Sequence, residues 1–171
     1  MPYVGGSLTT LFDDAARALT MEAEHDMCDE GARSVESITR MNTPVRTGAL
    51  RAAWKRDPAV PTMHGGEWAW AGRVSNSTSY AADVEYGTGL WGPKHSKYLI
   101  LPRTPGGVLR FIGRDGQVVF ARRVMHPGSP GNHMLEIGMT VTEALVASGG
   151  MFESILARWK SAIEAKATAS N

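Results

Sequence analysis

The sequence predicts an α+β fold, in which a long N-terminal helix and a C-terminal helix pack on a small antiparallel β-sheet with a projecting β-hairpin. Three observations predict this class. Apolar residues recur at helical spacing near both ends of the chain, strand-like segments lie between them, and a D-G step separates two β-rich runs. With 171 residues, 43% of them hydrophobic and 20% charged, we expect a single domain over residues 1–171.

The N-terminal helix is predicted from five apolar residues that recur at i, i+3, i+4, i+7 and i+11 within residues 8–19. The apolar stripe continues more loosely to Ile38. Pro44 disfavours the helical conformation at Thr43, so we expect the helix to end near Met41.

The middle of the chain is expected to alternate between loops and short strands. Residues 42–65 are expected to be a loop with one short helical piece over 50–54. A strand should begin at Glu67, where aromatic and β-branched residues alternate with smaller or polar ones. Residues 81–86 fit either an extended or a helical piece, and residues 98–101 predict a short strand between loops.

Two β-rich runs joined by the Asp115-Gly116 step predict a hairpin over residues 108–124. Phe111 and Phe120 cannot both be buried within a bare two-stranded ribbon, which is only marginally stable in water. We therefore expect this hairpin to project and to contact another chain.

The C-terminal part begins with a stiff connector that contains two prolines. Residues 133–147 fit either a helix or a strand. The chain then ends in a predicted helix, because apolar residues between Phe152 and Ile163 keep helical spacing.

Charge is segregated along a chain whose net charge is only +1: residues 1–30 carry −6 and residues 94–125 carry +6. Two solvated faces of one monomer would explain this pattern, and so would a contact between copies or with nucleic acid. Proteins built to hold DNA are usually basic overall, so self-assembly is favoured over DNA binding.

No catalytic constellation stands out. Five scattered histidines lack metal-ligand spacing. His126, His133 and Glu136 could form a three-ligand site, but histidines in a surface loop are the favoured interpretation. Asp83 and Glu85 could act as an acid–base pair or hold a cation, although a turn packed on a sheet is favoured. We expect no enzymatic activity, no cofactor and no bound metal.

Cellular location is constrained by three features. One cysteine, Cys28, cannot form an internal disulfide, and the acids around it should raise its pKa. No run of 18 apolar residues occurs, and the N-terminus lacks the pattern of a signal peptide. We therefore expect a reducing, cytosolic compartment and no membrane contact.

Three segments, in this order and spacing, resemble one protein family. They are Thr43–Arg51, with a P-x-x-T-G-x-L pattern; Ser79–Thr88, with a Y-A-x-x-V-E-Y-G-T pattern; and Val124–Ser129, with an H-P-G pattern. They are similar to segments of the tail-component proteins of long-tailed phages, the small neck or tail-completion proteins of the head–tail junction. The resemblance spans roughly residues 8–165. The residues that carry it are Pro44, Thr47, Gly48, Leu50, Tyr80, Glu85, Gly87, His126, Pro127 and Gly128.

The resemblance implies a structural virion protein without catalysis, a head–tail junction domain that forms a ring around the DNA channel. It implies a homo-oligomeric ring, with six or twelve copies, that contacts connector or head-closure proteins and tail-terminator or tail-tube proteins. It also implies non-specific contact with packaged DNA, assembly in the host cytoplasm and location in the virion neck or tail. After H-P-G the chain departs from the usual aromatic-rich pattern, and it carries a basic insert before that motif. A tail-tube terminator or minor tail component therefore stays open as an alternative, with a small metal-dependent enzyme less favoured.

The charge segregation suggests how such a ring would close. We expect the acidic helix of one subunit to face the basic segment of its neighbour in a head-to-tail contact. Exposed charge pairs contribute only about 0–1 kcal/mol each, so apolar hairpin contacts would supply most of the affinity. Alternatively, the basic segment lines the channel and touches DNA. The expected interface residues are Arg110, Phe111, Arg114, Phe120, Arg122 and Arg123 in the hairpin, and Asp26, Asp29 and Glu30 in the helix.

The three motifs also have expected local roles. In the first, Pro44 ends the helix, Gly48 permits a bend, Thr47 bonds local backbone and Leu50 anchors the core. In the second, the expectation is that Gly87 ends the element, while the other residues alternate between two faces. Tyr80, Val84 and Tyr86 should face the core, and Asp83 and Glu85 should face outward. The third should form a stiff exit from the hairpin.

Overall fold

The computed structural model describes the backbone of residues 8–169, and side chains from Thr20 onward except at positions 166, 167 and 169. The fold is α+β, as predicted, with small two-stranded antiparallel sheets between the N-terminal and C-terminal helices. The chain forms two compact units: unit 1 contains the chain up to Asn76 and from Met134 onward, and unit 2 is Ser77–His133. The span predicted as one domain thus contains two compact units.

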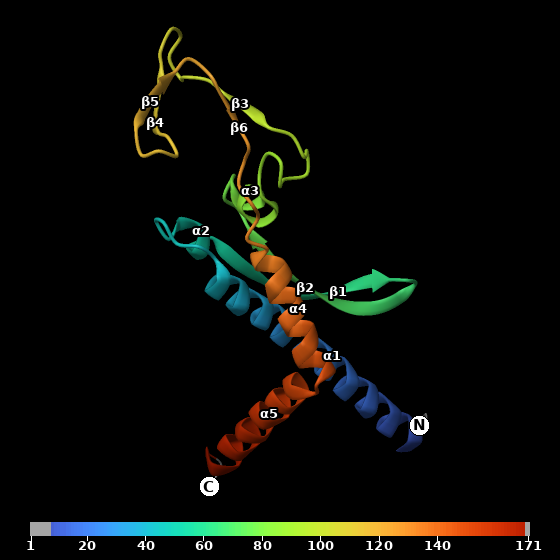
Figure 1. The fold of residues 1–171 in the computed structure, drawn as a ribbon. Coiled ribbons are helices and arrows are strands. Elements are labelled where there is room, and N and C mark those ends of the chain that lie inside the picture. The colour runs from blue at the N-terminus through green and yellow to red at the C-terminus, as the bar shows by residue number, and fades with distance from the viewer. Residues whose placement is uncertain (1–7, 170–171) are drawn as a thin grey trace. The chain divides into compact units, whose positions relative to one another are not determined.

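Unit 1 combines helices from both ends of the chain with one long hairpin (Figure 1). Its elements are α1 (Leu8–Asn42), α2 (Ala49–Ala52), β1 (Trp54–His64), β2 (Glu67–Asn76), α4 (Met134–Ala147) and α5 (Gly150–Ala169). Helix α1 ends at Asn42, one residue after the predicted end and immediately before Thr43. The side chains of residues 8–19, which suggested the start of this helix, lie outside the described ones.

The β1–β2 hairpin corrects the expectation of a loop over residues 42–65. Only α2 was anticipated there; β1 pairs antiparallel with β2 along its length, around a turn of Gly65 and Gly66, which have φ of +61° and +89°. Two prolines made β1 look unlike a strand. Pro58 lies where the register shifts, and Pro61 lies opposite Trp70 in a two-stranded sheet, where each strand is an edge that tolerates proline.

The hairpin packs closely on α1. A Cβ atom at Gly72 of β2 would lie 2.8 Å from Ala32 Cβ, so only glycine allows this approach of strand to helix. Nearby, the ring of Trp70 meets the ring of His25 edge-on, with centroids 4.8 Å apart. Figure 1 shows the hairpin on one side of α1, with its tip pointing away from the helix.

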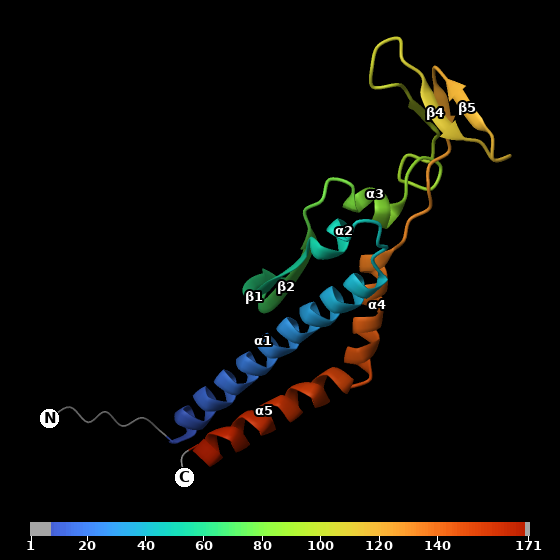
Figure 2. The ribbon, with the colours of Figure 1, turned by 90° about the vertical axis from the view of Figure 1, so that its left-hand side faces the viewer.

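Residues 133–147, which the sequence left open between helix and strand, form α4 after His133. The β-like segment is helical because it packs tightly on α1: a Cβ at Gly138 would lie 2.4 Å from Thr39 Oγ1, and Thr142 Oγ1 donates to Ser34 Oγ at 3.1 Å. Two C-terminal helices replace the single predicted one. They meet at a bend, visible in Figure 2, where Gly149 has a φ of +79°.

The buried apolar side chains of the described chain all lie in unit 1. They are Ala32, Leu50, Trp54, Ala59, Met134, Met151 and Ile155. Met134 at the start of α4 and Ile155 in α5 are almost completely enclosed. This core joins α1, the hairpin and the two C-terminal helices.

Unit 2 is built from short elements: α3 (Ala81–Tyr86), β3 (Tyr98–Ile100), β4 (Leu109–Ile112), β5 (Val118–Ala121) and β6 (Val124–His126). Strand β3 pairs with β6, and β4 pairs with β5 as the hairpin predicted over residues 108–124. The last residue of that span, Val124, belongs to β6 instead. No apolar side chain of unit 2, all of which is described, is buried.

Candidate assembly surfaces

The first motif forms a buried polar joint at the end of α1. The Thr43 hydroxyl donates to Thr39 O at 2.7 Å and accepts from Trp54 Nε1 at 2.9 Å. Arg51 donates to Thr43 O at 2.8 Å. Because Thr43 and Trp54 are both buried, these bonds replace the water that each polar group loses. The joint fixes where the chain leaves α1 and starts β1.

The local roles expected within this motif match the observed geometry. Pro44 follows the last residue of α1 by two positions, and Gly48 has a φ of +83°. Thr47 Oγ1 accepts a bond from Ala49 N at 3.4 Å, and Leu50 is buried. These are roles in folding, and the family role of the motif stays a prediction.

The second and third motifs lie side by side in unit 2, although about 40 residues separate them in the sequence. Thr88 N donates to Ser129 O at 2.8 Å and Leu90 N donates to Pro127 O at 2.7 Å. In the reverse direction, Ser129 N donates to Thr88 Oγ1 at 3.0 Å. We call the joined segments 84–92 and 126–133 the glycine clasp.

Glycine is required in this clasp because backbone lies directly on backbone. A Cβ at Gly128 would lie 2.0 Å from Thr88 O, and one at Gly89 would lie 2.2 Å from Pro127 O. A Cβ at Gly87 would lie 2.7 Å from Gly131 N. Gly87, Gly89 and Gly128 also have positive φ, between +63° and +93°. Both close approach and backbone conformation therefore exclude other residues.

The predicted facing of the second motif is wrong for three of its residues. Glu85 is 6% exposed, whereas Tyr80 and Tyr86 are exposed; Asp83 is exposed, as expected. The prediction assumed alternation along an extended segment, but residues 81–86 form α3, in which neighbouring side chains turn by about 100°. Gly87 follows α3 directly, in the position expected for it.

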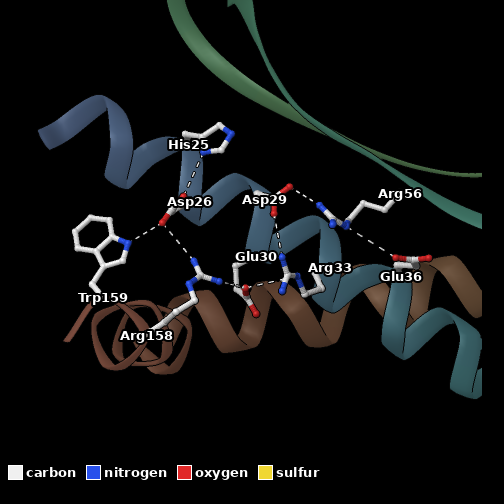
Figure 3. Close-up of polar contacts among 9 residues, drawn as sticks. All are labelled: His25, Asp26, Asp29, Glu30, Arg33, Glu36, Arg56, Arg158 and Trp159. Carbon is white, nitrogen blue, oxygen red and sulfur yellow. Dashed lines mark hydrogen bonds and ion pairs between the residues drawn. The ribbon is translucent and has the colours of Figure 1, made fainter. Parts of the chain in front are cut away.

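Two of the acids expected at a subunit interface bind partners within unit 1. Asp26 accepts from Trp159 Nε1 at 2.7 Å and from Arg158 Nη2 at 3.3 Å (Figure 3). Glu30 accepts from Arg158 Nη1 at 2.8 Å. Both contacts tie α1 to α5.

The third acid, Asp29, binds elsewhere in unit 1. It pairs with Arg56 of β1 and, at 3.3 Å, with Arg33 one helical turn away. Arg56 also lies 3.9 Å from Glu36. The acidic side of α1 thus holds the hairpin and α5 in place, while its contact with a neighbouring subunit stays a prediction.

These contacts change the acidity of Asp26. The hydrogen bond from the Trp159 indole, with smaller contributions from His25 and Arg158, lowers the pKa of its carboxyl despite an opposing effect of burial. Asp26 is therefore ionised at neutral pH.

The basic hairpin presents a different surface. In the β4–β5 ribbon, Arg110 lies opposite Phe120 and Ile112 lies opposite Val118, so these four share one face. Ile112 is 72% exposed and Phe120 is 64% exposed. None of the hairpin arginines forms a hydrogen bond or ion pair with a described residue; they are Arg110, Arg114, Arg122 and Arg123.

Residues considered for chemistry do not assemble into a site. Among the side chains that the structure describes, no three of His, Cys, Asp or Glu come close enough to hold a metal ion. His126 Nδ1 accepts a bond from Gly128 N at 2.9 Å, inside the clasp.

The pKa of the Cys28 thiol is raised, as expected, but burial contributes more to the increase than the neighbouring Asp29 does. A hollow of about 500 Å³ in unit 2 is lined by four clasp residues and by neighbouring residues that include Asp83, Lys94 and Tyr98.

Sequence reasoning missed the partners of the acids and the pairing of the clasp. Arg56 and Arg158 carry no local signal that links them to α1. Clasp formation did have a signal, since glycines recur at 87, 89 and 92 and again at 128 and 131.

None of the described helices combines the length and apolar character needed to cross a lipid bilayer.

Comparison with known proteins gives no match to this chain among family models, curated proteins or solved structures.

Proposed function

We propose that this chain is a structural, non-catalytic subunit that forms a homo-oligomeric ring at the head–tail junction of a long-tailed phage. The observation that carries the proposal is the exposure of apolar side chains in unit 2, whose 57 residues include no buried apolar side chain. Exposed apolar surface on this scale is typical of a protein–protein interface. The phage junction as the place of assembly rests on the resemblance of the three motifs.

Charge supports contact between copies. Unit 2 carries seven bases and three acids, for a net charge of +4, so the rest of the chain carries −3. Copies of this chain therefore present surfaces of opposite sign to one another. Such complementarity sets the orientation and the rate of association more than the affinity.

The proposal is tested by mixing the purified chain with neighbouring connector and tail components and examining the mixture by negative-stain electron microscopy. Rings of uniform diameter that join connector to tail are expected. The natural chain is compared with the Phe120→Ser and Ile112→Ser double variant, which removes exposed apolar surface from the ribbon. This variant should form fewer rings without loss of helical circular dichroism. A chain that stays monomeric in every mixture, and that antibodies do not find in virions, would overturn the proposal.

A second measurement addresses catalysis. The proposal requires no chemistry at His126, His133 or Glu136. Single alanine variants at His133 and Glu136 should give the same substoichiometric metal content as the natural chain, and the His133 variant should also assemble like it. Stoichiometric metal that these variants lose would favour the enzyme alternative.

A further inference from the structure

We propose that the β4–β5 ribbon of one copy docks on helix α4 of a second copy, along the face formed by Glu136, Met139, Glu143 and Val146. This inference rests on the proposed ring and names its contact. It also replaces the acidic part of α1 as the receiving surface, because the three acids expected there are bound within unit 1.

The apolar face of the β4–β5 ribbon requires a packing partner. A two-stranded ribbon is marginal in water unless a third element packs on it. Here one face carries Ile112, Val118 and Phe120, each at least 45% exposed, and unit 2 contains no buried apolar side chain with which they could pack. The same face carries Arg110, and Arg122 and Arg123 follow β5 directly. A fitting partner is therefore both apolar and acidic.

Helix α4 has that chemistry. Its 14 residues include two acids and no base, whereas α1 and α5 carry both signs. Glu136, Met139, Glu143 and Val146 follow one another at spacings of three, four and three, which places them on one face. Met139 is 50% exposed and Val146 is 47% exposed. Glu143 forms no hydrogen bond or ion pair with a described residue, so its carboxylate is available to a guanidinium.

The dimensions also agree. Four residues per ribbon strand extend about 13 Å, and the 14 residues of α4 extend about 21 Å. Helix α4 packs on α1 through Gly138 and Thr142, and the centre of the proposed face is turned about 100° from them around the helix. All four residues of the proposed face are exposed, so docking would leave unit 1 intact. DNA would satisfy the arginines but not the apolar side chains between them. A second copy satisfies both.

Disulfide crosslinking tests the contact directly. In a Cys28→Ser background, the Phe120→Cys and Met139→Cys pair is oxidised with copper phenanthroline and run on a non-reducing gel. A reducible ladder of dimers and larger species is expected, while each single-cysteine variant should stay largely monomeric. The matched control pairs Phe120→Cys with Ser161→Cys, an exposed position on α5, and should give at most background crosslinking. If the test pair perturbs folding by circular dichroism, Val118→Cys with Val146→Cys replaces it.

Charge exchange provides an independent test by sedimentation velocity. Glu143→Arg should weaken self-association by about tenfold or more, and so should Arg110→Glu, because each places like charges in contact. Both changes in one chain should restore association. Glu164→Arg, at an exposed acid of α5, is the control and should have little effect.

Three results would overturn the inference. Crosslinking within one chain, seen as a monomer of altered mobility, would mean that the occupant is not a second copy. Equal association of all charge variants would remove the charge contact. Loss of affinity for a double-stranded DNA fragment in Arg110→Glu, with unchanged self-association, would assign the ribbon to DNA.

Failure of this inference is distinguishable from failure of the proposed function. Rings without the Phe120–Met139 crosslink would overturn the docking face and leave the ring standing. A ladder without rings in the presence of connector and tail components would support the docking face and overturn the junction role.

Discussion

Each of the two units of this protein is stabilised by a different kind of internal contact. Unit 1 has an apolar core and a buried polar joint, in which the side chains of Thr43, Trp54 and Met134 make the contacts. Unit 2 is closed by backbone on backbone at the glycine clasp, and its apolar side chains are left at the surface. The comparison teaches that a segment can be given a defined shape while its side chains stay available for a partner.

The largest expected effect comes from Gly128→Ala. The added Cβ would lie 2.0 Å from Thr88 O at a φ of +93°, so the clasp should open at a cost of about 3 kcal/mol or more. Hydrogen–deuterium exchange of peptides over 84–92 and 126–133 should rise steeply while that of α1 stays unchanged. The matched control is Gly106→Ala, which has a φ of +76° with open space around it and should cost about 1 kcal/mol. Equal behaviour of the two variants would contradict the clasp.

Thr43→Val tests the side-chain joint of unit 1. Valine keeps the shape but leaves the Trp54 indole N–H without its buried acceptor, so unfolding free energy should fall by about 1–3 kcal/mol. Chemical denaturation followed by Trp fluorescence measures this change. The exposed Thr140→Val is the control. Clasp peptides should keep their exchange protection in Thr43→Val; simultaneous loss in both units would show that they unfold as one.

Asp26→Asn tests the tie between α1 and α5. At neutral pH the loss of a charged acceptor for Arg158 and Trp159 should cost about 1 kcal/mol. The folded-state pKa of Asp26 is lowered, so its contribution is complete above the ordinary carboxyl pKa and is lost as pH falls through the lowered value. The natural chain should therefore lose more stability than Asp26→Asn on acidification from about pH 5 to pH 2. The exposed Glu24→Gln is the control, and equal acid sensitivity of Asp26→Asn and the natural chain would count against the tie.

The smallest effect concerns Cys28, which reports how well unit 1 is sealed. Burial raises the pKa of its thiol, so at pH 8 less thiolate should be present in the folded chain than in the unfolded one. Alkylation by iodoacetamide at pH 8 should be slower in the native protein than in urea. Gly72→Ala, which pushes β2 away from Ala32, should speed it. Identical native and unfolded rates would argue against a sealed contact between β2 and α1.

Local signals predicted local features, and long-range contacts explain what was missed. The end of α1 follows from Pro44, because that ring acts on its immediate neighbour. Strand β1 was missed because Pro58 and Pro61 are unfavourable for strands, while the pairing that accommodates them depends on β2.

The same distinction applies to the candidate surfaces. The β4–β5 hairpin was predictable from its turn and its β-rich flanks. Phe111 and Phe120 are exposed because a ribbon of only two strands cannot bury both side chains. The acids of α1 were assigned to a neighbour because Arg56 and Arg158, their partners, lie 27 and 128 or more residues away in the chain. Burial of Glu85 depended on α3 being a helix, which periodicity over six residues cannot decide.

The glycine clasp also has an entropic consequence. Asn132 N donates to Val84 O and His133 N donates to Glu85 O. These bonds join the segment that enters unit 2 to the segment that leaves it, at the base of the unit. The segment from residue 92 to residue 126, which contains β3 to β6, then begins and ends at fixed points, as a closed loop does. Doubling the length of such a loop costs only about 0.6 kcal/mol of closure entropy. A lineage carrying this fold can therefore lengthen, shorten or exchange the outer segment at little thermodynamic cost, which makes the base of unit 2 a natural graft point for new recognition sequences.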